Sequence, residues 1–239
     1  MTYSLPLKQR NLPDRLADHL VNMIAKGELK PGQRLFEKEI CEGQRVSRIP
    51  VREALRLLQA QGIVRTEPNR GTFVTGFTSD EMSQLLELRL GVERIALRTI
   101  LGRGTPKPDI TSQFADVLED MRRAAKLDDQ LAYCQADLSF HNRIVDLSFS
   151  PVLSPVWQLL SRGVLVFLMQ EHDSAFDYDQ SIREHERLLA LIQMGKKIAL
   201  EQERERHILG KMTLHRSLRE QPAEQEDLSE ALPSKDARG

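Results

Sequence analysis

The stretch RVSRIPVREAL, residues 45–55, decides how the first third of this chain folds. Its arginines recur three and four residues apart, so a helix would place them on one side of its surface. A second stripe at similar spacing is apolar and would seat the helix on a core. The basic stripe consists of Arg45, Arg48, Arg52 and Arg56, and the apolar stripe of Val51, Ala54, Leu55 and Leu58. Such a basic stripe either contacts a polyanion or is a solvated helix face.

The residues on either side of this stretch predict a small mixed unit. Apolar spacing predicts a first helix from Leu12 to Gly27 and a short second helix over 36–43. Ser47 is the expected N-cap of a third helix, which Gly62 ends. Residues 63–75 then read as two short strands around a tight turn. This order is that of a winged helix-turn-helix, in which the third helix enters the DNA major groove and the β-hairpin is the wing.

From residue 80 onward the chain shows only helical periodicity. Six helices in about 140 residues predict an all-α bundle. They are expected at about 80–102, 110–125, 129–147, 152–171, 176–194 and 196–218. The predicted fold is therefore mostly α, with an N-terminal winged helix-turn-helix and a C-terminal six-helix bundle. We expect domains at 1–76 and 80–220, and a disordered polar tail at 222–239.

Composition supports two modules with different partners. The 239 residues carry a formal net charge of only -1. Residues 1–75, however, hold 13 basic against 8 acidic side chains, a net of +5, which leaves 21 against 27, a net of -6, for the rest. A basic module joined to an acidic one suggests that only the first meets a polyanion. No apolar run is long enough for a membrane span, and two isolated cysteines fit a reduced, cytoplasmic protein.

The segment LKPGQRLFEKEICEGQRVSRIPVREALRLLQAQGIVRTEPNRGTFV, residues 29–74, resembles the GntR family of bacterial transcription regulators. The matching motifs are a Pro-Gly turn, Val-Ser-Arg-x-Pro-Val-Arg-Glu-Ala-Leu from residue 46, and the wing Asn-Arg-Gly-Thr from residue 69. Two positions depart from the family pattern. Arg45 stands where the family usually has glycine in the turn, and Ile49 where it has threonine. Arg45 is expected to strain that turn if a positive φ is required there.

The resemblance implies roles for particular residues of the basic module. Arg48 and Arg52 lie at the start of the third helix, where an arginine can donate two hydrogen bonds to guanine O6 and N7. Phosphate and minor-groove contacts are implied for a second set. That set is Lys38, Ser47, Arg70 and Gly71.

The second half carries a possible metal site. Asp137 and His141 lie i, i+4 on one predicted helix and so share a face. His185 and His207 flank Gly195 by ten and twelve residues, or about 15 and 18 Å along the two arms of a helical hairpin. Both imidazoles should therefore lie at nearly the same height. One carboxylate and three imidazoles suit Zn²⁺, Ni²⁺, Fe²⁺ or Mn²⁺.

The motifs ELRLGVERIAL, DLSFHNRIV and EHERLLALIQMGKKIALEQERERH resemble the FCD effector-binding domain of the FadR subfamily, and six helices favour its VanR-like branch. That resemblance implies a divalent metal held by Asp137, His141, His185 and His207, which helps to bind a small carboxylate effector. His215 is an alternative to His207, whereas His172 is expected at the surface. Two arginines are candidates for binding the anionic effector. They are Arg89, which forms an Arg-x3-Glu pattern with Glu93, and Arg162.

These features predict a ligand-responsive transcription regulator that is not an enzyme. It would act as a homodimer on a palindromic operator, most often as a repressor, with a metabolite shifting the balance of dimer arrangements. Two alternatives remain open at this point. The helical domain could be a metal-dependent hydrolase or isomerase fused to a DNA-binding module, or the metal could be purely structural.

Overall fold

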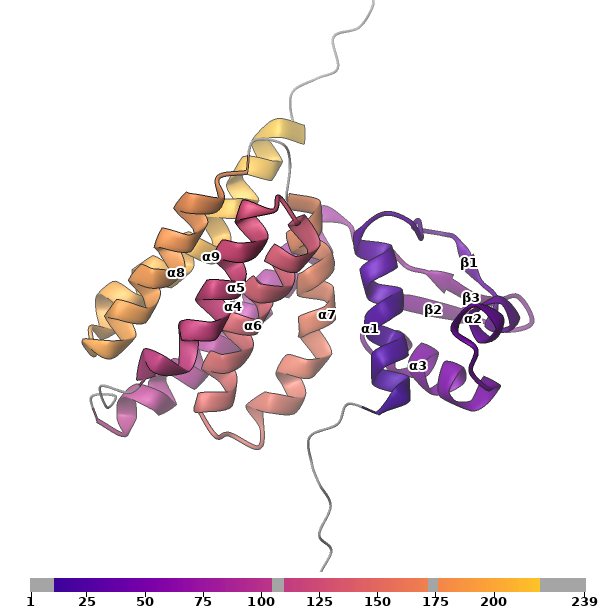
Figure 1. Ribbon diagram of the computed structural model, residues 1–239, viewed down its shortest axis with the longest axis horizontal. Helices are drawn as coiled ribbons and strands as arrows, with labels where there is room; N and C mark the ends of the chain where they lie inside the picture. Colours follow the sequence, from indigo (N-terminus) through magenta and orange to yellow (C-terminus); the bar gives the residue numbers. More distant parts are fainter. Residues whose placement is uncertain (1–10, 105–109, 172–175, 220–239) are drawn as a thin grey trace, which may run out of the picture.

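The first module of the computed structural model is a three-helix unit with a small sheet (Figure 1). The structure describes residues 11–104, 110–171 and 176–219, so the predicted tail at 222–239 lies outside the described residues. The three strands form one antiparallel sheet in the order β1-β3-β2. The elements are α1 (Leu12–Ala25), β1 (Arg34–Leu35), α2 (Glu37–Gln44), α3 (Arg48–Ala60), β2 (Val64–Glu67) and β3 (Gly71–Val74).

The predicted hairpin is confirmed as β2 and β3, but the sheet has a third strand that the sequence did not indicate. Arg34 and Leu35 pair with Phe73 and Thr72, in a segment expected to be only a turn. A two-residue strand cannot show the alternation by which a strand is recognised. Its pairing comes from the hairpin that folds beside it.

The apolar stripe of the opening stretch faces the core as predicted. Val51, Ala54, Leu55 and Leu58 are all buried on α3, whose main neighbour is α1. At the helix start Ser47 occupies the N-cap position, but its side chain makes no capping hydrogen bond. The burial of one stripe leaves the arginine stripe directed outward.

Arg45 is the strained residue of the turn between α2 and α3. It is the C-cap of α2 and has φ 53° and ψ 45°, in the left-handed region. A side chain with a Cβ is disfavoured there by about 1–2 kcal/mol, whereas glycine adopts this conformation freely. The turn geometry thus explains why glycine would suit position 45.

Replacing Arg45 by glycine should therefore stabilise the protein by about 0.5–1 kcal/mol, after the greater flexibility of glycine in the unfolded chain is subtracted. Urea unfolding followed by circular dichroism would measure the change. Gly43→Ala, two residues earlier and within α2, is a useful comparison because its added methyl group meets no neighbour within 4 Å. A loss of stability in the Arg45→Gly variant would show that the arginine side chain itself stabilises the turn.

The second module consists of six α-helices within the described ranges, in agreement with the predicted bundle. A capping box starts the first of them, because Thr78 and Glu81 satisfy each other's backbone N–H groups. A short 3-10 helix, η2 (Ser112–Phe114), precedes the second and was not predicted. The helices are α4 (Ser79–Gly102), α5 (Ala115–Lys126), α6 (Gln130–Leu147), α7 (Leu153–Glu171), α8 (Tyr178–Gln193) and α9 (Lys197–Arg219).

The two modules pack against each other along α1 and α7, which lie side by side in Figure 1. One apolar core runs across the boundary, from Leu16 and Leu20 of α1 to Leu165 and Leu168 of α7. Because the two modules share this core, the DNA-binding unit is held in a defined orientation. The predicted domain limits at 76 and 80 remain predictions. Within the described ranges, none of the helices is long and apolar enough to cross a membrane.

Candidate DNA-binding and metal-binding sites

The start of α3 presents Arg48 and Arg52 to solvent. The Arg52 Nε donates a hydrogen bond to Glu37 Oε2 at 2.9 Å, so the first residue of α2 orients this guanidinium. Glu37 was not among the predicted site residues. Its only sequence signal is its place within the segment 29–74 that resembles the GntR family. Ile49, between the arginines, is 70% exposed and is an apolar group available at the same surface.

The remaining predicted DNA contacts lie on α2, at the N-cap of α3 and on the wing. Lys38 is exposed on α2, 3.8 Å from Glu42. Arg70 is exposed at the turn between β2 and β3, where it pairs with Glu67. Since Ser47 makes no capping hydrogen bond, its hydroxyl is not committed to the helix end.

Gly71 is a glycine for two reasons that the structure makes visible. Its φ is +108°, and a Cβ at this position would lie 2.9 Å from Arg34 Nε. The Arg34 guanidinium crosses over the Gly71 backbone and lies 4.8 Å from the centre of the Phe36 ring. Arg34 is thus a basic residue beside the wing that sequence reasoning missed, because its strand was not predicted.

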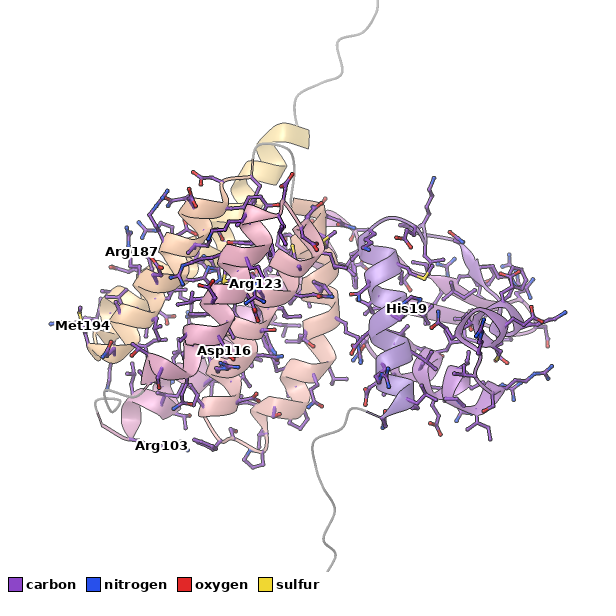
Figure 2. The ribbon with its side chains drawn as sticks, in the orientation of Figure 1. His19, Arg103, Asp116, Arg123, Arg187 and Met194 are labelled. Atoms are coloured by element: carbon purple, nitrogen blue, oxygen red, sulfur yellow. The ribbon has the colours of Figure 1, made fainter. Side chains whose placement is uncertain are left out.

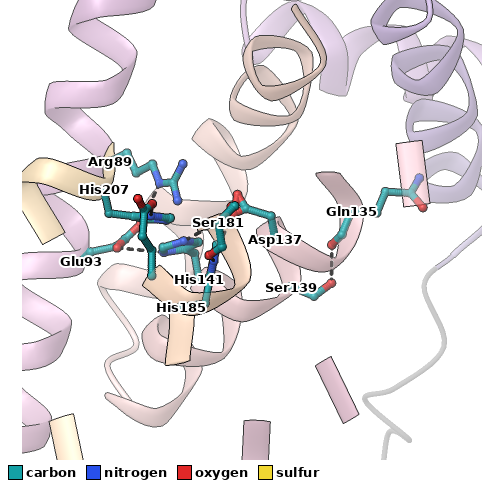
Figure 3. A network of polar contacts seen from close by, with 10 residues as sticks. Arg89, Glu93, Gln135, Asp137, Ser139, His141, Ser181, His185 and His207 are labelled. Carbon is teal, nitrogen blue, oxygen red and sulfur yellow. Dashed lines mark hydrogen bonds and ion pairs between the residues drawn. The ribbon is translucent and has the colours of Figure 1, made fainter. Parts of the chain in front are cut away.

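The four predicted metal ligands come together in the interior of the helical bundle (Figure 3). Each offers one ligand atom, and these atoms all lie within 4.8 Å of one another. All four side chains are buried, with exposed fractions of 2% or less. The predicted ligands are Asp137 and His141 of α6, His185 of α8 and His207 of α9. The helical hairpin does place His185 and His207 at the same height.

A second layer, of two carboxylates and one backbone carbonyl, holds each imidazole by its Nδ1 atom. His141 Nδ1 lies 3.0 Å from Glu93 Oε2, and His207 Nδ1 lies 2.9 Å from Glu184 Oε2. His185 Nδ1 lies 2.7 Å from the Ser181 carbonyl oxygen. These oxygens accept hydrogen bonds, so each Nδ1 is the donor and each Nε2 presents a lone pair to the centre of the cluster. This is the arrangement in which histidines bind metals.

The inner atoms of the cluster are placed so that a cation could lie between them. His185 Nε2 lies 2.9 Å from Asp137 Oδ2, and in the neutral tautomer both atoms are acceptors. His141 Nε2 is buried and has no hydrogen-bond partner within the part of the chain that the structure describes. Three imidazole nitrogens and one carboxylate also make a donor set suited to a first-row divalent ion. The residues therefore fit a metal.

Arg89 and Glu93 form the outer support of this cluster from α4. The Arg89 Nε donates to Glu93 Oε1 at 2.9 Å, and both side chains are almost completely buried. Burial opposes ionisation of Glu93, but at acidic pH, where His141 is protonated, the charges of His141 and Arg89 outweigh it and lower the pKa of Glu93 to about 2. Burial, together with the charge of Arg89, lowers the pKa of His141 to about 4, which keeps this imidazole neutral and able to bind a metal at neutral pH.

Models of two protein families match the chain, one over the DNA-binding module and one over the helical bundle. "Bacterial regulatory proteins, gntR family" matches residues 12–74, and the FCD domain matches residues 84–210, more than half of the chain. This chain belongs to the GntR family. As a GntR regulator with an FCD domain it is a DNA-binding transcription regulator and not an enzyme, so the metal-dependent hydrolase or isomerase considered from the sequence is set aside.

Relatives of this GntR regulator include proteins with named operons. It is 28% identical to the gluconate operon transcriptional repressor of Bacillus subtilis, over 65% of this chain and 63% of the relative. It is 28% identical to the HTH-type transcriptional regulator LutR of the same organism, over 72% and 87%. A solved structure of a putative GntR regulator from Rhodococcus sp. RHA1 has 23% identity and a TM-score of 0.70, covering 86% of this chain and 97% of the other. That likeness shows a shared fold.

The structure does not bring every predicted residue of this GntR regulator to the metal cluster. Arg162 lies instead at the junction of the modules, where its Nε donates to Asp18 Oδ1 at 2.9 Å and its Nη2 to Asp14 Oδ1 at 3.3 Å. Its Nη1 also donates to Gln61, so all three of its nitrogens face the DNA-binding module. His172 and the side chain of His215 lie outside what the structure describes.

Proposed function

We propose that this GntR regulator is a homodimeric repressor whose FCD domain binds a small carboxylate effector together with a divalent metal. The observation that carries the proposal is the buried cluster in which three Nε2 atoms and Asp137 converge while Nδ1 partners fix each ring. Bacterial operator DNA lies in the cytoplasm, and we place the protein there. A palindromic operator would match the two-fold symmetry of the dimer.

On DNA, Arg48 and Arg52 would read base edges in the major groove. Glu37 supports this role, because its bond to Arg52 limits the directions that the guanidinium can take. The exposed Ile49 side chain suits contact with a thymine methyl group. Contacts to phosphates and the minor groove are assigned to four residues of α2, the α3 cap and the wing. They are Lys38, Ser47, Arg70 and Gly71.

In the FCD domain, Asp137, His141, His185 and His207 would hold a Zn²⁺, Ni²⁺, Fe²⁺ or Mn²⁺ ion. A bound divalent cation would supply a Lewis-acid site for one oxygen of the effector. Arg89 is the candidate to bind the second oxygen of the effector carboxylate. Its Nη2 is buried and has no hydrogen-bond partner within the described residues, so a donor remains available near the cluster.

The names of two relatives narrow the first compounds to try. One relative is a gluconate operon repressor and another a probable D-xylose utilization operon repressor from Paenarthrobacter nicotinovorans. Sugar acids carry the carboxylate that the cluster suits, and they are related to the sugars and sugar acids in the names of these two relatives. We take them as the leading effector class, ahead of simple monocarboxylates.

A thermal-shift screen of sugar acids and other carboxylic acids against metal-loaded protein should give a raised melting temperature with at least one acid. A ligand present at 100 times its Kd stabilises the native state by about 2.7 kcal/mol. In the Arg89→Gln variant the same acid should give little or no shift, although the variant still binds DNA. Arg123→Gln, an exposed arginine of α5, is the matched control and should keep the full shift. Equal shifts of the melting temperature in both variants would show that Arg89 does not bind the effector.

If the metal were purely structural, the same screen would give a different result. In that case a chelator would lower the melting temperature of the protein but leave its affinity for the acid unchanged. An effector that no longer binds after chelation would instead support the role of the metal in effector binding.

A further inference from the structure

A cavity of about 430 Å³ lies where the DNA-binding module meets the FCD domain. Its walls are α1 of the first module and α6 and α7 of the second, and α7 contacts both of the other helices. Small-molecule sites usually have volumes of about 300–1,000 Å³ and occur preferentially at such domain interfaces. The cavity is separate from the metal cluster, because none of the four predicted metal ligands lines it.

Helix α6 turns one face to this cavity and a different face to the metal cluster. Residues three and four apart form the cavity face, and in Figure 3 two of them lie on the side of α6 turned away from the cluster. A face that packs on a core would be apolar, but three of these four residues are polar, which suits a polar occupant. The four are Gln135, Leu138, Ser139 and Asn142.

Three charged side chains on the other two walls give the cavity a negative charge. The fork of Arg162 on α7 donates to Asp18 Oδ1 at 2.9 Å and to Asp14 Oδ1 at 3.3 Å. The lining holds these two carboxylates and this one guanidinium, a net of -1. The fork also holds both carboxylates in place. A small cation is therefore attracted to the cavity, whereas an anion such as the carboxylate effector is not.

Several polar groups of the lining have hydrogen-bonding capacity left. Asn22 Oδ1 accepts from Gln135, and Asn142 Oδ1 accepts from Trp157, so each of these amides still has its NH2 group as a donor. Within the part of the chain that the structure describes, neither NH2 group has a partner, and Asp14 Oδ2 has none either. A ligand that satisfies all of them needs a cationic amine for the carboxylate and oxygen atoms for the amides.

We propose that this cavity is a second small-molecule site, which takes a small hydroxylated amine such as an amino sugar. Its ammonium group would bind Asp14, and its hydroxyl oxygens would accept hydrogen bonds from Asn22 and Asn142. Two buried apolar residues of the lining, Val21 and Leu165, would contact its carbon atoms. Because the lining comes from both modules, a bound amine would stabilise this arrangement of the modules over any other. The regulator would thus respond to an amine as well as to an acid.

Isothermal titration calorimetry of the full chain tests the class of ligand. Glucosamine and ethanolamine are the probes, and glucose is the control because it has a hydroxyl group in place of the amine of glucosamine. At least one of the two amines should bind, and glucose should bind about 10-fold more weakly than glucosamine or not at all, since it cannot make the charged hydrogen bond. Binding of neither amine would overturn the site. Equal affinities for glucosamine and glucose would overturn its preference for a cation.

Removal of the metal separates this site from the metal cluster. The chelated protein and the His185→Ala variant should bind the amine with the affinity of the metal-loaded wild type, because the cavity shares no residue with the cluster. An amine that no longer bound after chelation would lie at the cluster instead. That result would overturn the second site and leave the proposed function standing.

Two variants of the lining test whether the amine lies in the cavity. Asp14→Asn removes one charge but keeps an oxygen for Arg162, and it should weaken binding of the amine about 10-fold. Ser139→Phe fills the cavity from α6 without changing its charges, so it should abolish binding of the amine and leave the metal content unchanged. Ala199→Phe adds the same ring at an exposed position of α9 and should bind the amine as the wild type does. Unchanged affinity in either lining variant would overturn the site.

Discussion

Replacing Arg52 by alanine should abolish selective binding to the operator and leave the protein folded. A bidentate arginine–guanine pair contributes about 1–3 kcal/mol of discrimination, and the proposed dimer on a palindrome would lose the pair twice, about 2–6 kcal/mol in all. The preference for the operator over unrelated DNA should then fall at least ~30-fold. The lost ion pair with Glu37 is exposed, so its contribution to folding is small.

The measurement needs an operator, which selection from a pool of random duplexes by wild-type protein can supply. Gel-shift titrations of the selected and a scrambled duplex then give the ratio of affinities. Arg123→Ala removes another exposed arginine, from α5, and should not change this ratio. If the Arg52→Ala protein kept its preference for the selected duplex, α3 would not read bases through this residue.

Loss of one imidazole from the buried cluster should have an equally large effect on metal content. Purified wild-type protein is expected to hold about one divalent ion per chain, and His185→Ala close to none. Metal present at 1,000 times its Kd stabilises the native state by about 4.1 kcal/mol, which for a domain of this size corresponds to roughly 8–16 °C in Tm. Chelated wild-type protein should therefore melt that much lower.

Mass spectrometry of the metal content and thermal denaturation with and without a chelator would check this result. His19→Ala is the matched control, since His19 lies on α1 in the DNA-binding module (Figure 2) and contacts only Gln44 among the polar contacts described. It should keep both the metal and the response to chelation. A wild type that binds no divalent ion after dialysis against each of the four candidates would contradict the metal site.

Much of the fold could be predicted because each helix has its own local signals. The apolar spacing of α3 predicted its buried stripe, and the helical periodicity from residue 80 predicted α4, which begins at Ser79. The equal heights of His185 and His207 followed from counting residues on either side of Gly195. Each of these predictions depends only on residues that lie close together in the sequence, within one helix or two consecutive helices.

What the sequence could not indicate depends on contacts between distant segments. Strand β1 exists only because β3 pairs with it. Glu184 is 23 residues from His207 and Glu93 is 48 residues from His141, so their support of the two rings appears only once the bundle is assembled. Arg162 was a candidate for the effector site because an anionic effector usually needs a cation besides the metal, yet its partners lie 144 and 148 residues away in α1.

The contacts of Arg162 with Asp14, Asp18 and Gln61 limit how the domains of such regulators can be exchanged. In a chimera that joins this FCD domain to the winged helix of another regulator, foreign residues would occupy the positions of Asp14, Asp18 and Gln61. Without acids there, a guanidinium that is only 13% exposed would lose its counter-charges, and unsatisfied groups of this kind cost about 1–3 kcal/mol each. A working hybrid would have to carry α1 along with the FCD domain, or exchange Arg162 to match its new neighbour.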